Sequence, residues 1–238
     1  MILRVRYAKL GKVRFTSHRD TARIWERAVR RAGLPVVTSS GFTPRPRASF
    51  GLALPTGAES IAEYLDLEVV DGALCEADHG NLGGLPDRLS DALPRGFRAL
   101  LVAEVAPGSG SLQDVVTSVT WELTAPAGAD NAAAADRLLS AEALPLERER
   151  KGERRVDDVR PLIVSLATSA DGATMIAELA TTGRSLRPAE LATLAFPNAD
   201  PVDVRVLRTH QWIEHDGNRR EVLALPDAVP PRTAEVRA

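Results

Sequence analysis

The chain has 238 residues, of which 44% are hydrophobic and 26% charged, a composition typical of a folded globular protein that excludes disorder, collagen and coiled coil. Its single cysteine, Cys75, excludes an intrachain disulfide and cannot alone supply a structural zinc site or an iron–sulfur cluster. The formal net charge of −2 conceals a division, because residues 1–50 carry twelve Lys or Arg against two acidic residues, whereas the other 188 carry eighteen basic and thirty acidic residues. A basic segment on an acidic chain predicts contact with nucleic acid or another polyanion, and a solvated surface balanced by acidic neighbours is the alternative.

The first half of the chain shows alternating strand patterns around one strongly predicted helix. Residues 2–7 and 13–15 alternate as a strand with a bend at Gly11, and Ser17 followed by Asp20 predicts a capped helix over residues 18–32. Further strands are expected at 34–38, 50–54, 64–69 and 98–105, with a weak helix at 78–93. This β-α-β-β-α-β order is that of the ferredoxin-like split βαβ unit.

The second half repeats the plan less clearly. We expect strands at 119–124, 144–150, 160–167, 174–181 and 202–208, and helices at 129–141 and 188–195. The fold class is therefore predicted to be α+β, with two tandem ferredoxin-like domains at residues 1–107 and 108–215 and a small-residue linker from Pro107 to Ser111. Residues 216–238 form a charged, proline-containing tail that we expect to be partly disordered.

Arginines recur on one face of the predicted first helix, at spacings of four, four and three. Only Glu26, four residues before Arg30, is placed to neutralise this stripe. A Gly/Pro-rich loop then presents two more arginines and an aromatic ring, which could stack on a base or anchor the loop. The residues predicted to bind nucleic acid are Arg14, Arg19, Arg23, Arg27, Arg30, Phe42, Arg45 and Arg47.

His18 is the one candidate catalytic residue, because a neutral imidazole among arginines could act as the base in RNA cleavage. Recognition of a phosphate or base and a local structural role are its alternatives. His210 and His215 are spaced poorly for a metal site, and no phosphate-binding glycine loop is present, so we predict no metal and no cofactor. Paired acidic and basic residues around Asp157 predict a salt-bridged hairpin, with contact to a partner or RNA as the alternative. Ile2 to Arg6 alternates like a strand rather than a signal peptide, so we expect a cytoplasmic protein.

Several motifs resemble those of a known bacterial family. They include Arg14-Phe15-Thr16-Ser17-His18-Arg19-Asp20, Gly41-Phe42-Thr43-Pro44-Arg45-Pro46, Leu54-Pro55-Thr56-Gly57 and, more loosely, Leu186-Arg187-Pro188-Ala189-Glu190-Leu191. The sequence is similar to the radical-SAM-linked family of uncharacterised bacterial proteins, which are encoded beside or fused to a cobalamin-binding radical SAM protein. This resemblance implies a radical SAM partner that acts on RNA such as tRNA or rRNA.

The leading hypothesis is a non-catalytic, RNA-binding accessory protein that holds phosphates for a radical SAM enzyme. The tandem ferredoxin-like order is also similar to RAMP-type endoribonucleases, a likeness of element order and His18 alone. The alternatives are therefore a metal-independent endoribonuclease that uses His18, and a protein-interaction module that docks on the radical SAM partner without RNA.

Overall fold

The computed structural model describes residues 1–74, 82–106, 108–126, 128–150, 152–215 and 217–225. Within these residues, the strands of the main sheet are β1 (Ile2–Lys9), β2 (Ala48–Phe50), β3 (Glu59–Glu68), β4 (Phe97–Glu104), β5 (Val116–Thr124), β8 (Ile163–Thr168), β9 (Thr174–Ala180), β10 (Arg205–His215) and β11 (Asn218–Glu221). A separate hairpin consists of β6 (Pro145–Arg150) and β7 (Glu153–Asp158). The helices are α1 (His18–Arg31), α2 (Leu85–Ala92), α3 (Leu112–Val115), α4 (Asn131–Ser140) and α5 (Pro188–Ala195).

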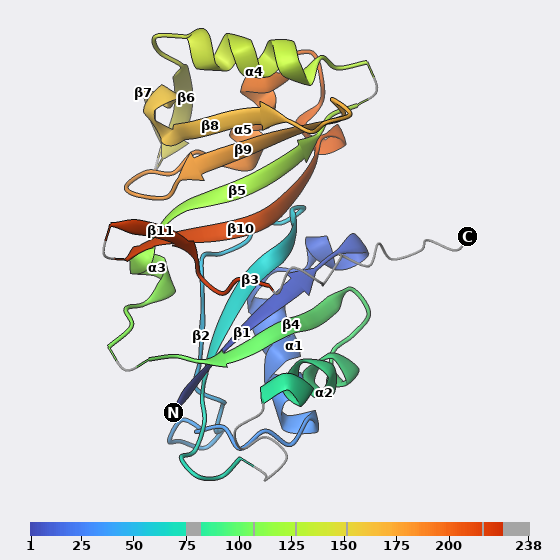
Figure 1. Cartoon of the computed structure of the whole chain (residues 1–238), viewed down its shortest axis with the longest axis vertical. Coiled ribbons are helices and arrows are strands. Elements are labelled where there is room, and N and C mark those ends of the chain that lie inside the picture. The colour runs from blue at the N-terminus through green and yellow to red at the C-terminus, as the bar shows by residue number, and fades with distance from the viewer. Residues whose placement is uncertain (75–81, 107, 127, 151, 216, 226–238) are drawn as a thin grey trace, which may run out of the picture.

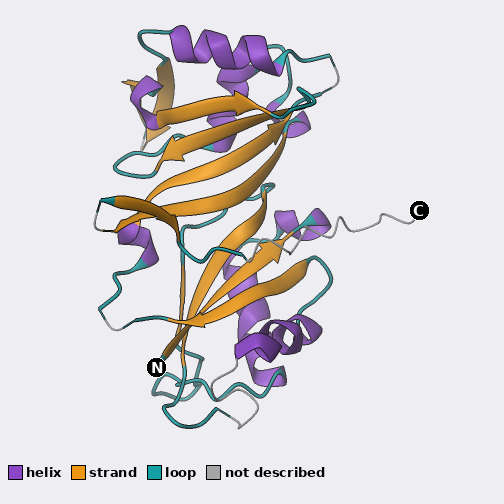
Figure 2. Cartoon of the chain, in the orientation of Figure 1, coloured by secondary structure: helices purple, strands orange, loops and turns teal. Residues whose placement is uncertain are grey.

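The main sheet runs along the long axis of the molecule in the order β4-β1-β3-β10-β5-β9-β8 (Figure 1). Its strand pairs are antiparallel except for β3 and β10, which pair in parallel through Glu59 with Leu207 and Ser60 with Arg208. The short strand β2 adds to β3, and β11 adds to β10. The fold is thus mixed α+β, with a large, mostly antiparallel sheet and few helices (Figure 2).

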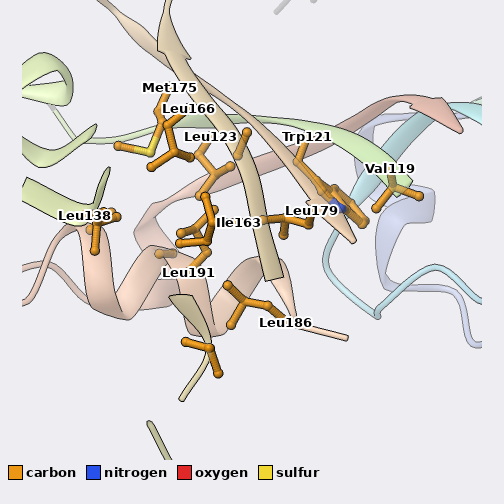
Figure 3. Close-up of a cluster of buried hydrophobic side chains, with 14 of the residues drawn as sticks. Val119, Trp121, Leu123, Leu138, Ile163, Leu166, Met175, Leu179, Leu186 and Leu191 are labelled. Atoms are coloured by element: carbon orange, nitrogen blue, oxygen red, sulfur yellow. The ribbon is translucent and has the colours of Figure 1, made fainter. Parts of the chain in front are cut away.

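Two buried clusters lie along this sheet. The first packs α1 and α2 against β1, β3 and β4, with Trp25 and Tyr7 in edge-to-face contact at a ring distance of 4.9 Å. The second packs α4 and α5 against β5, β8 and β9, and Figure 3 labels Leu138 and Leu191 of these helices in one cluster with Leu123 and Ile163 of the sheet. Each cluster thus includes its own pair of helices. The buried face of each helix fixes which of its residues point outward.

A buried polar network lies where the two clusters meet, at β3 and β10. The Arg6 guanidinium is 2% exposed and donates to Glu221, Leu223 and Thr209, all from the last part of the described chain. Arg208 is 3% exposed and pairs with Glu63 at 3.0 Å. Burial is also the main cause that lowers the pKa of His210 in this region, with the nearby guanidinium groups of Arg6 and Arg219 as lesser causes.

Most expected elements are present with shifted bounds, and some are wrong. Residues Gly11–Phe15 form a 3-10 turn rather than a strand. Gly11 has a φ of 71°, which turns the chain away from the sheet, and the amine of Lys9 donates to the Thr16 carbonyl at 2.7 Å to close that turn. The alternation of Val13 and Phe15 resembles that of a strand, but this segment pairs with no strand of the described sheet, and Phe15 stays 61% exposed.

Other bounds changed because pairing partners, which lie far away in the sequence, set the ends of strands. Residues 34–38 make only isolated bridges, and the strand expected at 202–208 begins at Arg205, after a 3-10 turn at Pro201–Asp203, and extends to His215. The first part of the expected tail is ordered, since β11 pairs with β10. Residues 226–238, Pro107 and Cys75 lie outside the described residues. The predicted salt-bridged hairpin is confirmed as β6 and β7.

The backbone of Gly96 lies so close to its neighbours that there is no room for a side chain. Its φ is +97°, and a Cβ atom there would lie 2.8 Å from the Leu10 carbonyl oxygen and 2.7 Å from Val13. We expect Gly96→Ala to cost roughly 1–3 kcal/mol more than Gly72→Ala, because Gly72 has a φ of +69° with open space around it and pays only the backbone strain. Urea unfolding of the two variants measures this difference, and equal costs would contradict the close approach.

Candidate nucleic-acid interface

Helix α1 carries the arginine stripe as the spacing predicted. The Ser17 hydroxyl accepts a hydrogen bond from the Asp20 backbone N–H at 3.1 Å and so caps the helix at its first residue. The face that packs on the sheet is buried through Trp25, Ala28 and Val29. Because these residues fix the rotation of the helix, the opposite face points outward, and its exposed residues are Arg19, Arg23, Arg27 and Arg30.

The loop before β2 is closed at its base by backbone contacts. Ser39 donates its backbone N–H to the Arg45 carbonyl at 2.8 Å, and its hydroxyl accepts from the Arg45 N–H at 3.1 Å. Phe42 at the loop tip is fully exposed, with a relative exposure of 111%. The interpretation of Phe42 as a hydrophobic anchor of the loop is therefore wrong, and its ring is free to stack on a partner.

One contact joins the helix stripe to this loop. The Arg30 guanidinium donates to the Pro44 carbonyl at 3.0 Å, which holds the loop against the last turns of α1. We call the resulting surface the α1–loop face, and it consists of Arg19, Arg23, Arg27, Arg30, Phe42, Arg45 and Arg47. Arg19 and Arg30, which are 11 positions apart on the helix, thus share one basic surface with Arg47, which follows Arg19 by 28 positions in the chain.

Part of the charge on the α1–loop face is neutralised by neighbours. Arg23 pairs with Asp20 at 3.3 Å and Arg47 pairs with Glu68 at 3.2 Å, both at the exposed surface. In the described part of the chain, no carboxylate forms an ion pair with Arg19, Arg27 or Arg45. These three guanidinium groups are therefore available to an external anion.

Several basic residues of the first fifty are buried or bind other groups of the chain instead. Arg4 forms a two-point contact with Asp66 at 2.7 and 2.8 Å, and Lys9 is 3% exposed. Arg6 belongs to the buried network, and Arg31 donates to the Ala92 carbonyl at 3.2 Å. The surface charge of this segment is therefore smaller than the formal +10 of its sequence.

His18 and Arg14 lie before the stripe and make contacts of a different kind. The exposed His18 ring meets the Phe50 ring edge-on at 5.2 Å, and the Arg14 guanidinium lies over the Phe15 ring at 4.6 Å. None of the described contacts places a general acid beside His18 or joins Arg14 to the α1–loop face. His18 therefore has a structural neighbour but no catalytic partner within the described residues.

The expected neutralisation of Arg30 by Glu26 is wrong. Arg30 turns to the Pro44 carbonyl instead, and the Glu26 side chain forms no ion pair or hydrogen bond with any described residue. The sequence offered no signal for this, because the loop that takes Arg30 comes 14 residues later. Across the described chain, no group of three or more His, Cys, Asp or Glu side chains is placed to hold a metal ion. None of the described helices is long and apolar enough to cross a bilayer.

The fold and this surface define a mixed α+β protein with an arginine-rich face on its first helix and the following loop. Residues 3–188 match the model of the family described as "Uncharacterized protein conserved in bacteria (DUF2344)", and the chain belongs to that family. A comparison with curated proteins finds no match. The family description names no activity and no partner, so the association with a radical SAM protein stays a prediction.

Proposed function

We propose that this protein is a non-catalytic, RNA-binding accessory protein, and that the α1–loop face binds the phosphates of a single strand. The observation that carries this proposal is the set of guanidinium groups of Arg19, Arg27 and Arg45, which pair with no described carboxylate, on a surface where the contact of Arg30 with Pro44 joins helix and loop. Guanidinium groups suit phosphate oxygens, and an exposed ring such as that of Phe42 suits stacking on an unpaired base.

We further propose that each half of the chain is a ferredoxin-like unit, as in RAMP-type RNA-binding proteins. The strand orders β4-β1-β3-β2 and β10-β5-β9-β8 support this proposal, because each reads 4-1-3-2 when its strands are numbered within the half. Within this scheme the basic face belongs to the first unit alone.

A radical SAM enzyme with a cobalamin-binding domain is the proposed partner. This part of the proposal rests on the resemblance of the sequence motifs. In such a pair, the accessory protein would hold the RNA while the enzyme modifies it. Docking of the same arginines on an acidic protein surface is the competing proposal, since both partners offer anions to one face.

The test is the salt dependence of binding to a labelled single-stranded RNA, together with the RNA content of protein purified at low salt. Phosphate contacts of the three available arginines predict that log K falls with log salt with a slope of about −2. Affinity that does not change between low and moderate salt would refute the RNA proposal. A stoichiometric complex with the radical SAM protein, free of nucleic acid, would support the docking proposal instead.

The endoribonuclease alternative has its own test at His18. We expect His18→Ala to retain RNA affinity within about twofold, because the His18 ring contacts Phe50 and not the arginines of the α1–loop face. We also expect neither protein to cleave RNA pools in the presence of a metal chelator. Cleavage by the parent protein that disappears in the folded variant would establish His18 as a catalytic base.

A further inference from the structure

A groove lies beside the arginine stripe, between α1 and the segment that runs from the loop into β2. Its volume is about 170 Å³, roughly that of five or six waters in the liquid at about 30 Å³ each. The side chains that line it include Trp25, Glu26, Val29, Pro46, Ala48 and Phe50. All of these except Glu26 are apolar, so the groove is an apolar slot with one carboxylate.

The Glu26 carboxylate lies in the wall of the groove and accepts no hydrogen bond from the described residues. Two arginines on the same helix could pair with it, but Arg23 pairs with Asp20 and Arg30 binds the Pro44 carbonyl. Glu26 is half-buried, and none of the described side chains or backbone groups donates to it. Its oxygens are therefore left for a ligand that donates hydrogen bonds and fits between apolar walls.

The neighbours of the groove select the class of ligand. The Arg30 guanidinium binds the carbonyl of Pro44, two residues before Pro46 in the wall of the groove. An occupant must therefore combine a flat, mostly apolar body with hydrogen-bond donors for the carboxylate and negative charge for the arginines. A nucleotide in a single strand has all three features, and the size of the groove suits one base and not a base pair.

The donor pattern selects the base. An ionised carboxylate only accepts hydrogen bonds and has two oxygens side by side. Guanine presents two adjacent donors on its Watson–Crick edge, the ring N1–H and the 2-amino group, whereas uracil presents one donor between two acceptors. We propose that this groove binds one unpaired guanine of a bound RNA strand, with Glu26 accepting from N1–H and the 2-amino group.

This inference rests on the proposed RNA-binding function, and the experiment separates the two. Fluorescence anisotropy would measure the affinity of the full chain for labelled nine-nucleotide oligouridine, and for the same strand with guanosine, inosine or cytidine at its centre. Binding of oligouridine measures the phosphate contacts alone. Binding of guanosine relative to uridine measures the groove, and inosine, which lacks the 2-amino group, measures one of the two hydrogen bonds.

We expect the guanosine strand to bind about tenfold more tightly than oligouridine, with the inosine strand between them. Glu26→Gln should remove this preference, because an amide presents only one acceptor oxygen and its NH₂ group opposes the donors of the base. Its affinity for oligouridine should stay equal or rise slightly, since the change removes one negative charge beside the α1–loop face.

Glu104→Gln is the matched control, because Glu104 is exposed at the end of β4 and the change alters the charge equally. It should keep the preference for guanosine. If oligouridine binds but guanosine gives no gain, or if Glu26→Gln keeps the gain, the guanine site is refuted while the RNA-binding function stands. If no strand binds at any salt concentration, the function and the site both fall.

Discussion

Replacing Arg19, Arg27 and Arg45 together with glutamine is expected to weaken binding of single-stranded RNA about 100-fold at 0.1 M salt. Each phosphate contact on a single strand contributes about 0.7 to the slope of log K against log salt, and three contacts therefore contribute about 2. These three side chains make no ion pair with a described carboxylate, so their loss removes phosphate contacts without breaking the fold.

The control for this variant carries the same change of charge elsewhere. Arg95, Arg98 and Arg220 are exposed and lie outside the α1–loop face, so their joint replacement with glutamine should change the affinity by no more than about a few-fold through the long-range field. Titrations at several salt concentrations compare both variants with the parent. Equal losses in the two variants would show that net charge, and not this surface, governs binding.

The largest effect on stability is expected at the pair of Glu63 and Arg208. Glu63→Met should lower the free energy of unfolding by about 3–5 kcal/mol, because the Arg208 guanidinium would stay buried without a carboxylate, with the carbonyls of Leu52 and Ala53 as its hydrogen-bond acceptors and the Trp121 ring beneath it. Urea unfolding followed by circular dichroism measures the loss.

Two further variants separate charge burial from other causes. Glu68→Gln removes the exposed partner of Arg47, and we expect a loss of at most about 1 kcal/mol. The double variant Glu63→Met with Arg208→Met should recover part of the loss, because it removes both buried charges. A single Glu63→Met variant as stable as Glu68→Gln would contradict a structural role for the buried pair.

The α1–loop face shows how much of the candidate site could be predicted. The sequence predicted helix α1, its cap at Ser17 and the outward direction of the arginines, because these depend on residues within one or two helical turns. It also predicted a loop around Pro44 and Pro46 from local backbone restrictions. The exposure of Phe42 and the contact of Arg30 with Pro44 could not be predicted, since they depend on how the loop packs against the helix.

At the junction of the two halves, the surroundings of the charged side chains could not be predicted from the sequence. In the sequence, Arg4 and Arg6 look like part of the basic surface, since they alternate with apolar residues along a strand. In the structure, Arg6 is buried because Glu221, 215 residues away, and the carbonyls of Leu223 and Thr209 surround it. A local pattern cannot show whether a strand has a second buried face, because that depends on what covers the sheet.

The α+β class, the position of most helices and strands, and the arginine stripe follow from local sequence patterns, because short-range periodicity and capping govern these features. The fold, and not the local pattern, sets which arginines are internal, and it places Glu26 in the wall of a groove with no partner among the described residues. The physical reason is that a charged side chain takes its partners from whatever the fold brings within hydrogen-bond distance, and the decisive partners here lie 14 to 217 residues away in the chain.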